Sequence, residues 1–230
     1  MRRVAVAAGG AAAAWSAPAL AAIWPPAARA LGIQSRLPGA PDGVALTFDD
    51  GPHPQGTPAI LDTLARAGAT ATFFLIGEQV ERHGSLAAEI AAAGHAIGVH
   101  GHRHRNLLRL TPGQLAADLD RAAEVIAGAT GSPLRLHRPP YGIFSPPGLR
   151  MVRRRGWRPL LWSRWGRDWS ARASAASIAD LVTRRLAAGD VLLLHDADHY
   201  SATGSWRRTA SALPRVLEAI ERRGLRPVTP

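Results

Sequence analysis

Five short polar segments carry side chains that could together perform metal-assisted hydrolysis. Along the chain they are residues 47–52, 100–104, 138–142, 168–169 and 193–196. One carboxylate and two histidines suit a divalent cation, while a second carboxylate and a distant histidine suit a general base and a general acid. Each segment comes where a predicted strand ends, so their order and spacing favour one shared site.

Two adjacent carboxylates, Asp49 and Asp50, follow the first predicted strand. Like charges at one strand end repel each other unless a cation screens them. A metal bound by one carboxylate would leave the other free to act as a base. The sequence Gly51-Pro52 then turns the chain sharply away. An ordinary acidic turn is the alternative for a bare Asp-Asp-Gly string.

Two histidines, His100 and His104, are separated by three residues. On a helix this spacing places both imidazoles on one face, and a tight loop after a strand can also bring them together. With one carboxylate they make a three-ligand set for zinc that leaves positions for water and substrate. The same set accepts cobalt, manganese or nickel. A solvated histidine-rich turn is the alternative.

Three further segments supply groups that could support this chemistry. Arg138 precedes two prolines, which stiffen the chain, and a rigid arginine can orient a carboxylate. His195 ends the most apolar strand and suits proton transfer near neutral pH. Asp168 and Trp169 could supply a polar partner and an aromatic wall for a sugar ring. The alternatives are a surface arginine, a core histidine and a core tryptophan.

The elements that must position these residues alternate between apolar runs and helical stretches. This pattern predicts about seven parallel strands joined by right-handed crossovers. The expected strands are Val44–Phe48, Ala71–Ile76, Ala96–Val99, Leu134–Leu136, Trp157–Trp162, Val191–Leu194 and Leu225–Val228. The expected helices are Pro58–Ala67, Ser85–Ala93, Pro112–Ala129, Pro147–Arg155, Ser177–Ala188 and Leu213–Arg223. Because five strands contribute polar groups, a closed or nearly closed barrel is favoured over an open sheet.

Length, composition and charge narrow the class of protein. A chain of 230 residues, 47% of them hydrophobic, can bury one sizeable core but not two full domains. It has no cysteine, which excludes disulfides and thiolate metal sites. The net charge is +11 and every basic residue is arginine. Compositional bias explains the arginines, or they attract an anionic polymer. No aromatic-interleaved basic stripe is present, so nucleic acid is not an expected partner.

The first thirty residues have the pattern of an export signal. Arg2 and Arg3 precede an uncharged, alanine-rich run from Val4 to Ile23, and Ala28-Arg29-Ala30 offers a small-x-small cleavage pattern. We expect a signal peptide or signal anchor at residues 1–30, a linker at 31–43 and a folded domain at 44–230. The protein would be a monomer in the extracellular space or cell envelope, with membrane contact if the segment is uncleaved. An alanine-rich helix packed on the domain is the alternative.

Taken together, the five segments closely resemble the polysaccharide deacetylases with a NodB-type homology domain, carbohydrate esterase family 4. The resemblance covers residue 44 to the C-terminus, and the strings at residues 47–52 and 138–142 are its most specific parts. It implies a distorted (β/α) barrel with a divalent metal, usually zinc. It also implies that Asp49 is the catalytic base, that His195 is the acid, and that Asp50, His100 and His104 are the metal ligands.

The resemblance assigns supporting roles to three more residues. Arg138 would orient Asp49. Tyr141 would offer its backbone N–H to the oxyanion, and Leu193 would line the pocket for the acetyl group.

Two positions depart from the family pattern. Gly101 stands where a serine or threonine is usual, which predicts a looser metal loop. Trp165 stands where the family has an aspartate that tunes the acid histidine, so the partner of His195 is open between Asp168 and Asp196.

The activity implied by the resemblance is removal of N-acetyl groups from an acetylated polysaccharide, peptidoglycan or chitin-like, with release of acetate. One alternative keeps the fold and changes the bond, namely an O-acetyl esterase acting on xylan. Another is a non-catalytic glycan-binding module of the cell envelope, which the two departures would permit.

Overall fold

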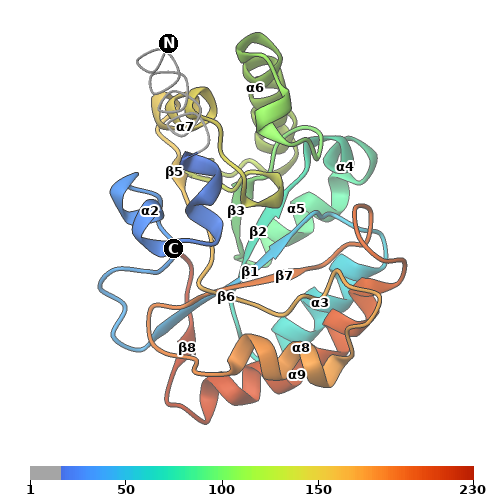
Figure 1. Ribbon diagram of the computed structural model, residues 1–230. Coiled ribbons are helices and arrows are strands. Elements are labelled where there is room, and N and C mark those ends of the chain that lie inside the picture. The colour runs from blue at the N-terminus through green and yellow to red at the C-terminus, as the bar shows by residue number, and fades with distance from the viewer. Residues whose placement is uncertain (1–16) are drawn as a thin grey trace.

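A curved sheet of parallel strands forms the centre of the computed structural model, which describes residues 17–230 (Figure 1). The strands follow the order β5-β4-β3-β2-β1-β7-β6, and β8 pairs with β1. They are β1 Gly43–Asp49, β2 Thr72–Leu75, β3 Ala96–Val99, β4 Leu136–His137, β5 Arg158–Pro159, β6 Arg164–Trp165, β7 Val191–His195 and β8 Arg226–Pro227. All of these pairings are parallel, as predicted.

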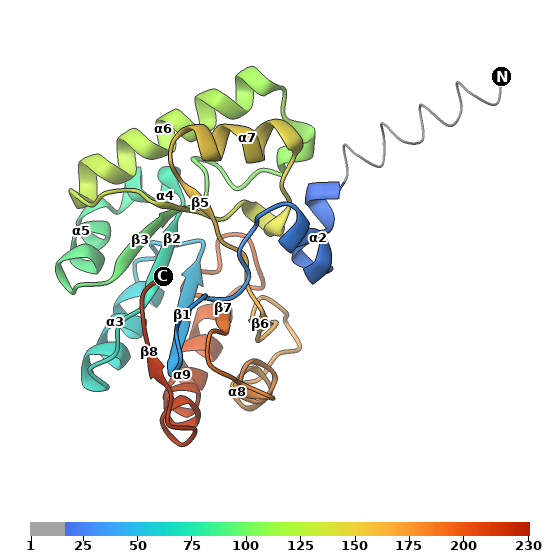
Figure 2. The same cartoon turned by 90° about the vertical axis from the view of Figure 1, so that its left-hand side faces the viewer.

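The helices lie outside the sheet, with α6 and α7 on one side and α8 and α9 on the opposite side (Figure 2). They are α2 Pro25–Ala30, α3 Gly56–Arg66, α4 Gly77–Arg82, α5 Gly84–Ala92, α6 Pro112–Thr130, α7 Pro146–Arg154, α8 Ala175–Thr183 and α9 Ser205–Glu221. Short 3-10 helices occur at η1 Ala17–Ala22, η2 Leu107–Arg109 and η3 Pro140–Gly142. Strand β1 is buried along its whole length, as expected of a strand covered on both faces.

The barrel is distorted because its two edge strands do not meet. Within residues 17–230 no ladder joins β5 to β6, which are the ends of the strand path. The prediction of a distorted (β/α) barrel is confirmed, and the distortion lies between these two strands.

The gap has a local cause in residues 157–162, which were predicted as one strand. Here the ladder β5 is two residues long, and Leu160 adds an isolated parallel bridge to Gln34. The carbonyl oxygens of Leu160 and Leu161 accept hydrogen bonds from the buried guanidinium of Arg138, at 3.1 and 3.0 Å. Those oxygens are therefore engaged by a side chain, and the predicted strand was too long.

Several helices also differ from the prediction, and α8 ends at Thr183 instead of Ala188. Helix α4 was not predicted, because its six residues are too few to show a helical repeat of apolar residues. Helix α9 begins at Ser205 rather than Leu213, and Pro214 lies inside it. The residues buried by its first turns include two small polar ones, Ser205 and Thr209. Small polar residues on the buried face concealed the start of the helix.

Part of the N-terminal segment packs against the domain, where Ala21 and Ala28 join the hydrophobic core. Ala21, Ala27 and Ala28 are buried. The predicted basic N-terminus and most of the uncharged run fall in residues 1–16, outside the described part of the chain. Within residues 17–230 no helix combines the length and the apolar character that crossing a bilayer requires. The boundaries at residues 30 and 43 remain predictions.

The loop after β3 is fixed by a carboxylate from α6. Asp118 accepts hydrogen bonds from the backbone N–H groups of His102 at 2.8 Å and Arg103 at 3.3 Å. Gly101 has a φ of 92°, which favours glycine. A Cβ at this position would lie 3.1 Å from Asp118 Oδ2 and 3.2 Å from the Arg103 carbonyl oxygen. The glycine therefore permits the loop that Asp118 holds.

We expect Gly101→Ser to lower the free energy of unfolding by about 1–3 kcal/mol, because a side chain would strain the backbone and crowd Asp118. Urea denaturation would measure the change. Gly128→Ser is a matched control, since a Cβ there meets nothing within 4 Å outside its own helix. Equal stability of Gly101→Ser and the wild type would contradict this reading of the loop.

Candidate active site

A cavity of about 390 Å³ opens at the carboxyl ends of β1, β3 and β7. Eight of the ten predicted site residues line it: Asp49, Asp50, His100, His104, Tyr141, Trp169, Leu193 and His195. The other two, Arg138 and Asp168, are fully buried and hydrogen-bond to residues of the wall. The five polar segments of the sequence therefore meet at one place.

The predicted metal ligands lie within reach of a single ion. One side-chain donor atom from each of Asp50, His100 and His104 lies within 4.8 Å of the other two. Asp50 Oδ1 is 3.4 Å from Nε2 of each histidine. It is buried and has no hydrogen-bond partner within residues 17–230. A buried, unpartnered carboxylate oxygen facing two imidazole nitrogens fits a divalent cation.

The protonation of the three groups agrees with a ligand role. His100 Nδ1 lies 2.7 Å from the Arg138 carbonyl oxygen, to which it can donate while Nε2 stays free. Burial lowers the pKa of His104 to about 4 against the opposing charge of Asp50. Burial also opposes ionisation of Asp50, but the neighbouring imidazoles of His100, His195 and His104 outweigh it, and the pKa of Asp50 lies well below the usual value.

Backbone geometry allows both adjacent carboxylates to face the cavity. Asp50 has a φ of 78°, a left-handed conformation that aspartate tolerates better than most residues. The strand alternation is broken at this point, so Asp49 and Asp50 do not point to opposite faces. The irregular strand end that the sequence suggested is present.

The rings of Tyr200 and Tyr141 pack against His104. The ring of Tyr200 stacks on His104 with centroids 4.3 Å apart and planes 11° apart, and the Tyr141 edge lies 4.5 Å away. The Tyr200 hydroxyl donates to Glu78 Oε1 at 2.6 Å and accepts from Gln79 Nε2 at 3.1 Å. Helix α4 thus anchors the ring that covers His104.

The candidate base is oriented by a buried arginine. Arg138 donates to Asp49 Oδ1 at 2.6 Å and to Thr47 Oγ1 at 2.8 Å from the same nitrogen. Its guanidinium lies 4.1 Å above the ring of Phe74. Burial lowers the pKa of Arg138, and the charge of Asp49 opposes that effect. The second oxygen of Asp49 is left facing the cavity, 3.8 Å from His100 Nε2.

The candidate acid has a carboxylate partner, and it is Asp168. Asp168 Oδ1 lies 2.9 Å from His195 Nδ1, and Oδ2 accepts from the His195 backbone N–H at 2.7 Å and from Thr209 at 2.9 Å. Asp196 instead accepts a hydrogen bond from Thr57, and burial raises the pKa of Asp196 to about 7. The geometry therefore identifies Asp168, and not Asp196, as the carboxylate partner of His195, which the sequence had left open.

The electrostatics of His195 differ sharply from those of His104. Burial works against a protonated imidazole, but the charge and hydrogen bond of Asp168, with the charges of Asp50 and Asp49, raise the pKa of His195 to about 10. Its Nε2 faces the cavity, 4.0 Å from Asp50 Oδ2. The edge of Trp169 packs against the imidazole at 5.6 Å. These contacts favour the protonated imidazole, as the predicted role of His195 requires.

The remaining predicted residues form walls. Tyr141 has a left-handed backbone with φ 61°, and its side chain is exposed at the rim. Leu193 is buried and contributes an apolar surface. The predicted roles of these two residues in binding the oxyanion and the acetyl group remain predictions.

Several lining residues were missed from the sequence. Trp162, Trp165 and Ile23 line the same cavity as the predicted groups. Ile23 comes from the N-terminal segment, which was assigned to a signal. Trp165 was read only as a departure from a pattern. Aromatic residues just beyond strand ends were the one available signal for the two tryptophans.

Comparisons with known proteins agree with this geometry. Residues 37–159 match the family model described as polysaccharide deacetylase. A chitooligosaccharide deacetylase of Azorhizobium caulinodans is 33% identical over 201 residues, which cover 84% of this chain and 95% of the relative. A peptidoglycan-N-acetylglucosamine deacetylase of Bacillus cereus is 34% identical over 189 residues, with coverage of 81% and 85%.

A solved structure gives the same result in three dimensions. The crystal structure of a peptidoglycan N-acetylglucosamine deacetylase bound to a naphthalenyl-substituted N-oxidanyl-benzamide aligns with a TM-score of 0.80 at 30% identity. The alignment covers 86% of this chain and 90% of that one. Sequence, fold and the grouping of side chains at the strand ends therefore agree that the chain belongs to the polysaccharide deacetylase family.

Proposed function

We propose that this protein removes N-acetyl groups from an acetylated polysaccharide and releases acetate, using a divalent metal held by Asp50, His100 and His104. The observation that carries the proposal is the convergence of these ligands with two separately supported proton carriers in one cavity. Asp49 is fixed by Arg138, and His195 by Asp168. The relatives named above act, by their names, on chitooligosaccharides and peptidoglycan.

The reaction follows from the positions of these residues. When bound, the metal supplies Lewis acidity that polarises a carbonyl oxygen and makes water easier to deprotonate. Asp49, oriented by Arg138, takes a proton from the attacking water as the water oxygen adds to the carbonyl carbon of the acetyl group. The Tyr141 N–H offers a donor to the developing oxyanion. His195 protonates the sugar nitrogen as the C–N bond breaks, and acetate and a free amino sugar leave.

Zinc is the metal we expect, because two imidazoles and a carboxylate suit it best, with cobalt, manganese and nickel as further candidates. An O-acetyl esterase would use the same groups, since ester hydrolysis also needs a base and an acid. Acetate release from acetylxylan but not from chitooligosaccharides or peptidoglycan would favour that alternative.

Export to the extracellular space or cell envelope is also part of the proposal. It rests on the basic start and uncharged run of the first thirty residues. Cleavage after Ala30 would remove Ala22 and Ile23, which line the cavity, whereas an uncleaved anchor would keep them. N-terminal sequencing of protein recovered from the culture medium and from membranes would separate these outcomes.

Removing a ligand should abolish metal binding. We expect Asp50→Asn and His104→Ala to reduce bound zinc from about one ion per chain to near zero, because two ligands hold a divalent ion poorly. Metal content after dialysis, measured by mass spectrometry, tests this. Asp180→Asn, an exposed carboxylate on α8, is the control. Full metal content in either ligand variant would remove that residue from the site.

Removing a proton carrier should slow turnover without releasing the metal. We expect Asp49→Asn and His195→Ala each to lower kcat for acetate release by roughly 10²–10⁴-fold. Metal content would be measured on the same samples to separate the two effects. Near-native turnover by either variant at full metal loading would show that its role has been misassigned.

The pH profile should report the partner of the acid. His195 must be protonated to act, so activity is lost as pH rises through its pKa, which Asp168 raises. Asp168→Asn removes that charge and should move the alkaline limb of the kcat profile to lower pH. Thr209→Val removes only a hydrogen bond to the same carboxylate and should shift the limb less. Coincident alkaline limbs in Asp168→Asn and the wild type would contradict the assignment.

A further inference from the structure

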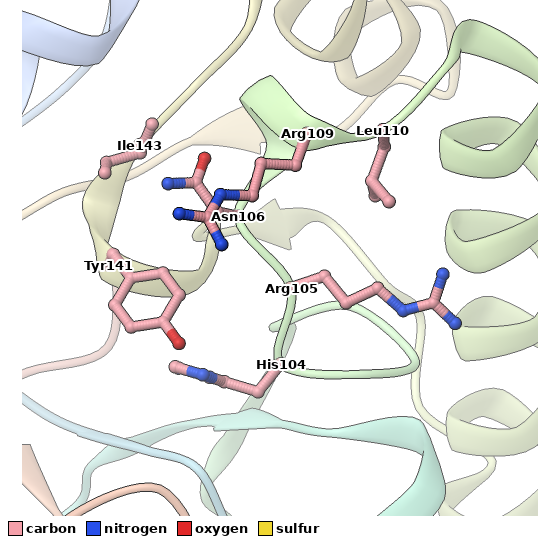
Figure 3. Close-up of a pocket in the computed structure, with 7 residues that line it drawn as sticks. All are labelled: His104, Arg105, Asn106, Arg109, Leu110, Tyr141 and Ile143. Carbon is pink, nitrogen blue, oxygen red and sulfur yellow. The ribbon is translucent and has the colours of Figure 1, made fainter.

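A second cavity, of about 470 Å³, adjoins the candidate active site (Figure 3). Its walls are the loop that carries His104, helix η2 and the turn at η3. It shares His104 and Tyr141 with the catalytic cavity. A chain-like substrate with its acetamido group at the catalytic centre could therefore extend into this space with a neighbouring sugar.

The charged side chains that line this cavity are positive. Arg105 and Arg109 line it together with Asn106, and no carboxylate does. Neither guanidinium makes a hydrogen bond or ion pair that would neutralise it within residues 17–230. In Figure 3 the guanidinium of Arg109 points from η2 toward Tyr141 and Ile143, while Arg105 extends the other way.

Some arginines elsewhere in the fold are paired with carboxylates. Arg121 pairs with Glu81 and Glu124, and Arg155 pairs with Asp120. An unpaired arginine that borders a cavity beside the catalytic centre is free to bind an anion of the substrate. A guanidinium binds carboxylates with two parallel hydrogen bonds, which makes it selective as well as attractive.

We propose that this cavity is a subsite for a carboxylate carried by the sugar next to the one being deacetylated. The proposal rests on the proposed deacetylase function and narrows its substrate to an anionic glycan. Arg109 supplies the principal contact and Arg105 adds to the positive field. The carboxylate can belong to the lactyl ether of a neighbouring muramic acid that carries no stem peptide, or to a uronic acid.

The test compares matched oligosaccharides that differ only in charge. Acetate release would be measured on a peptidoglycan disaccharide, on the same disaccharide with its lactyl carboxyl converted to a methylamide, on an N-acetylglucosamine–uronate oligosaccharide and on chitooligosaccharides. We expect the wild type to favour a carboxylate-bearing substrate by roughly tenfold in kcat/KM, mainly through KM. The two acidic substrates distinguish the two sources of the carboxylate.

Variants then locate the preference. Arg109→Gln should remove most of the roughly tenfold preference, Arg105→Gln should reduce it in part, and both should leave turnover of chitooligosaccharides and metal content unchanged. Arg215→Gln, an exposed arginine on α9, loses the same charge and should keep the preference. Added salt should weaken the preference of the wild type.

The outcomes separate this proposal from the deacetylase function. No preference in the wild type, or the same preference in Arg109→Gln, would overturn the subsite while acetate release stands. If no substrate releases acetate, calorimetric titration of Asp49→Asn with the acidic disaccharide and its methylamide still tests the subsite. Equal affinities for the two ligands in that titration would refute it.

Discussion

The buried Arg138 side chain is the constraint on which the rest of the structure depends. A guanidinium with no exposed surface is costly unless its donors are satisfied and its charge is paired. Here its nitrogens are bonded to Asp49, Thr47 and two backbone carbonyls. Its own carbonyl oxygen accepts from His100. One residue therefore orients the candidate base, accepts a hydrogen bond from a candidate metal ligand and bonds to two backbone carbonyls just beyond β5.

The opening of the barrel and the chemistry of the site are thus consequences of the same contacts. The carbonyl oxygens of Leu160 and Leu161 hold Arg138, while the backbone N–H groups of these residues donate to His137 and Gln34 beyond the end of β5. The side chains beyond this point, Trp162 and Trp165, then line the cavity. A perfectly regular barrel would not give Arg138 these acceptors.

Two imidazoles in one cavity acquire opposite properties from their surroundings. His195 has a carboxylate on its far nitrogen and a raised pKa, and His104 lies between aromatic rings and has a lowered one. Such a difference in pKa suits the proposed roles, with His195 as proton donor and His104 as neutral ligand. Asp50 lies near both and favours the protonated form of each, and burial opposes that form in each, so the difference comes mainly from Asp168.

The sequence predicted the elements whose signals are local and missed those set by contacts distant in the chain. Helix α6 has a capping box at Thr111 and a left-handed glycine at its end, and it lies where it was predicted. The length of β5, the partner of His195 and the role of Tyr200 depend on residues far away in sequence. The two departures from the family pattern illustrate the same limit. Asp118 fixes the loop at Gly101, and Asp168 hydrogen-bonds to His195, which Trp165 cannot do with a carboxylate. Each departure that would permit a non-catalytic module is therefore compensated by a carboxylate elsewhere in the fold.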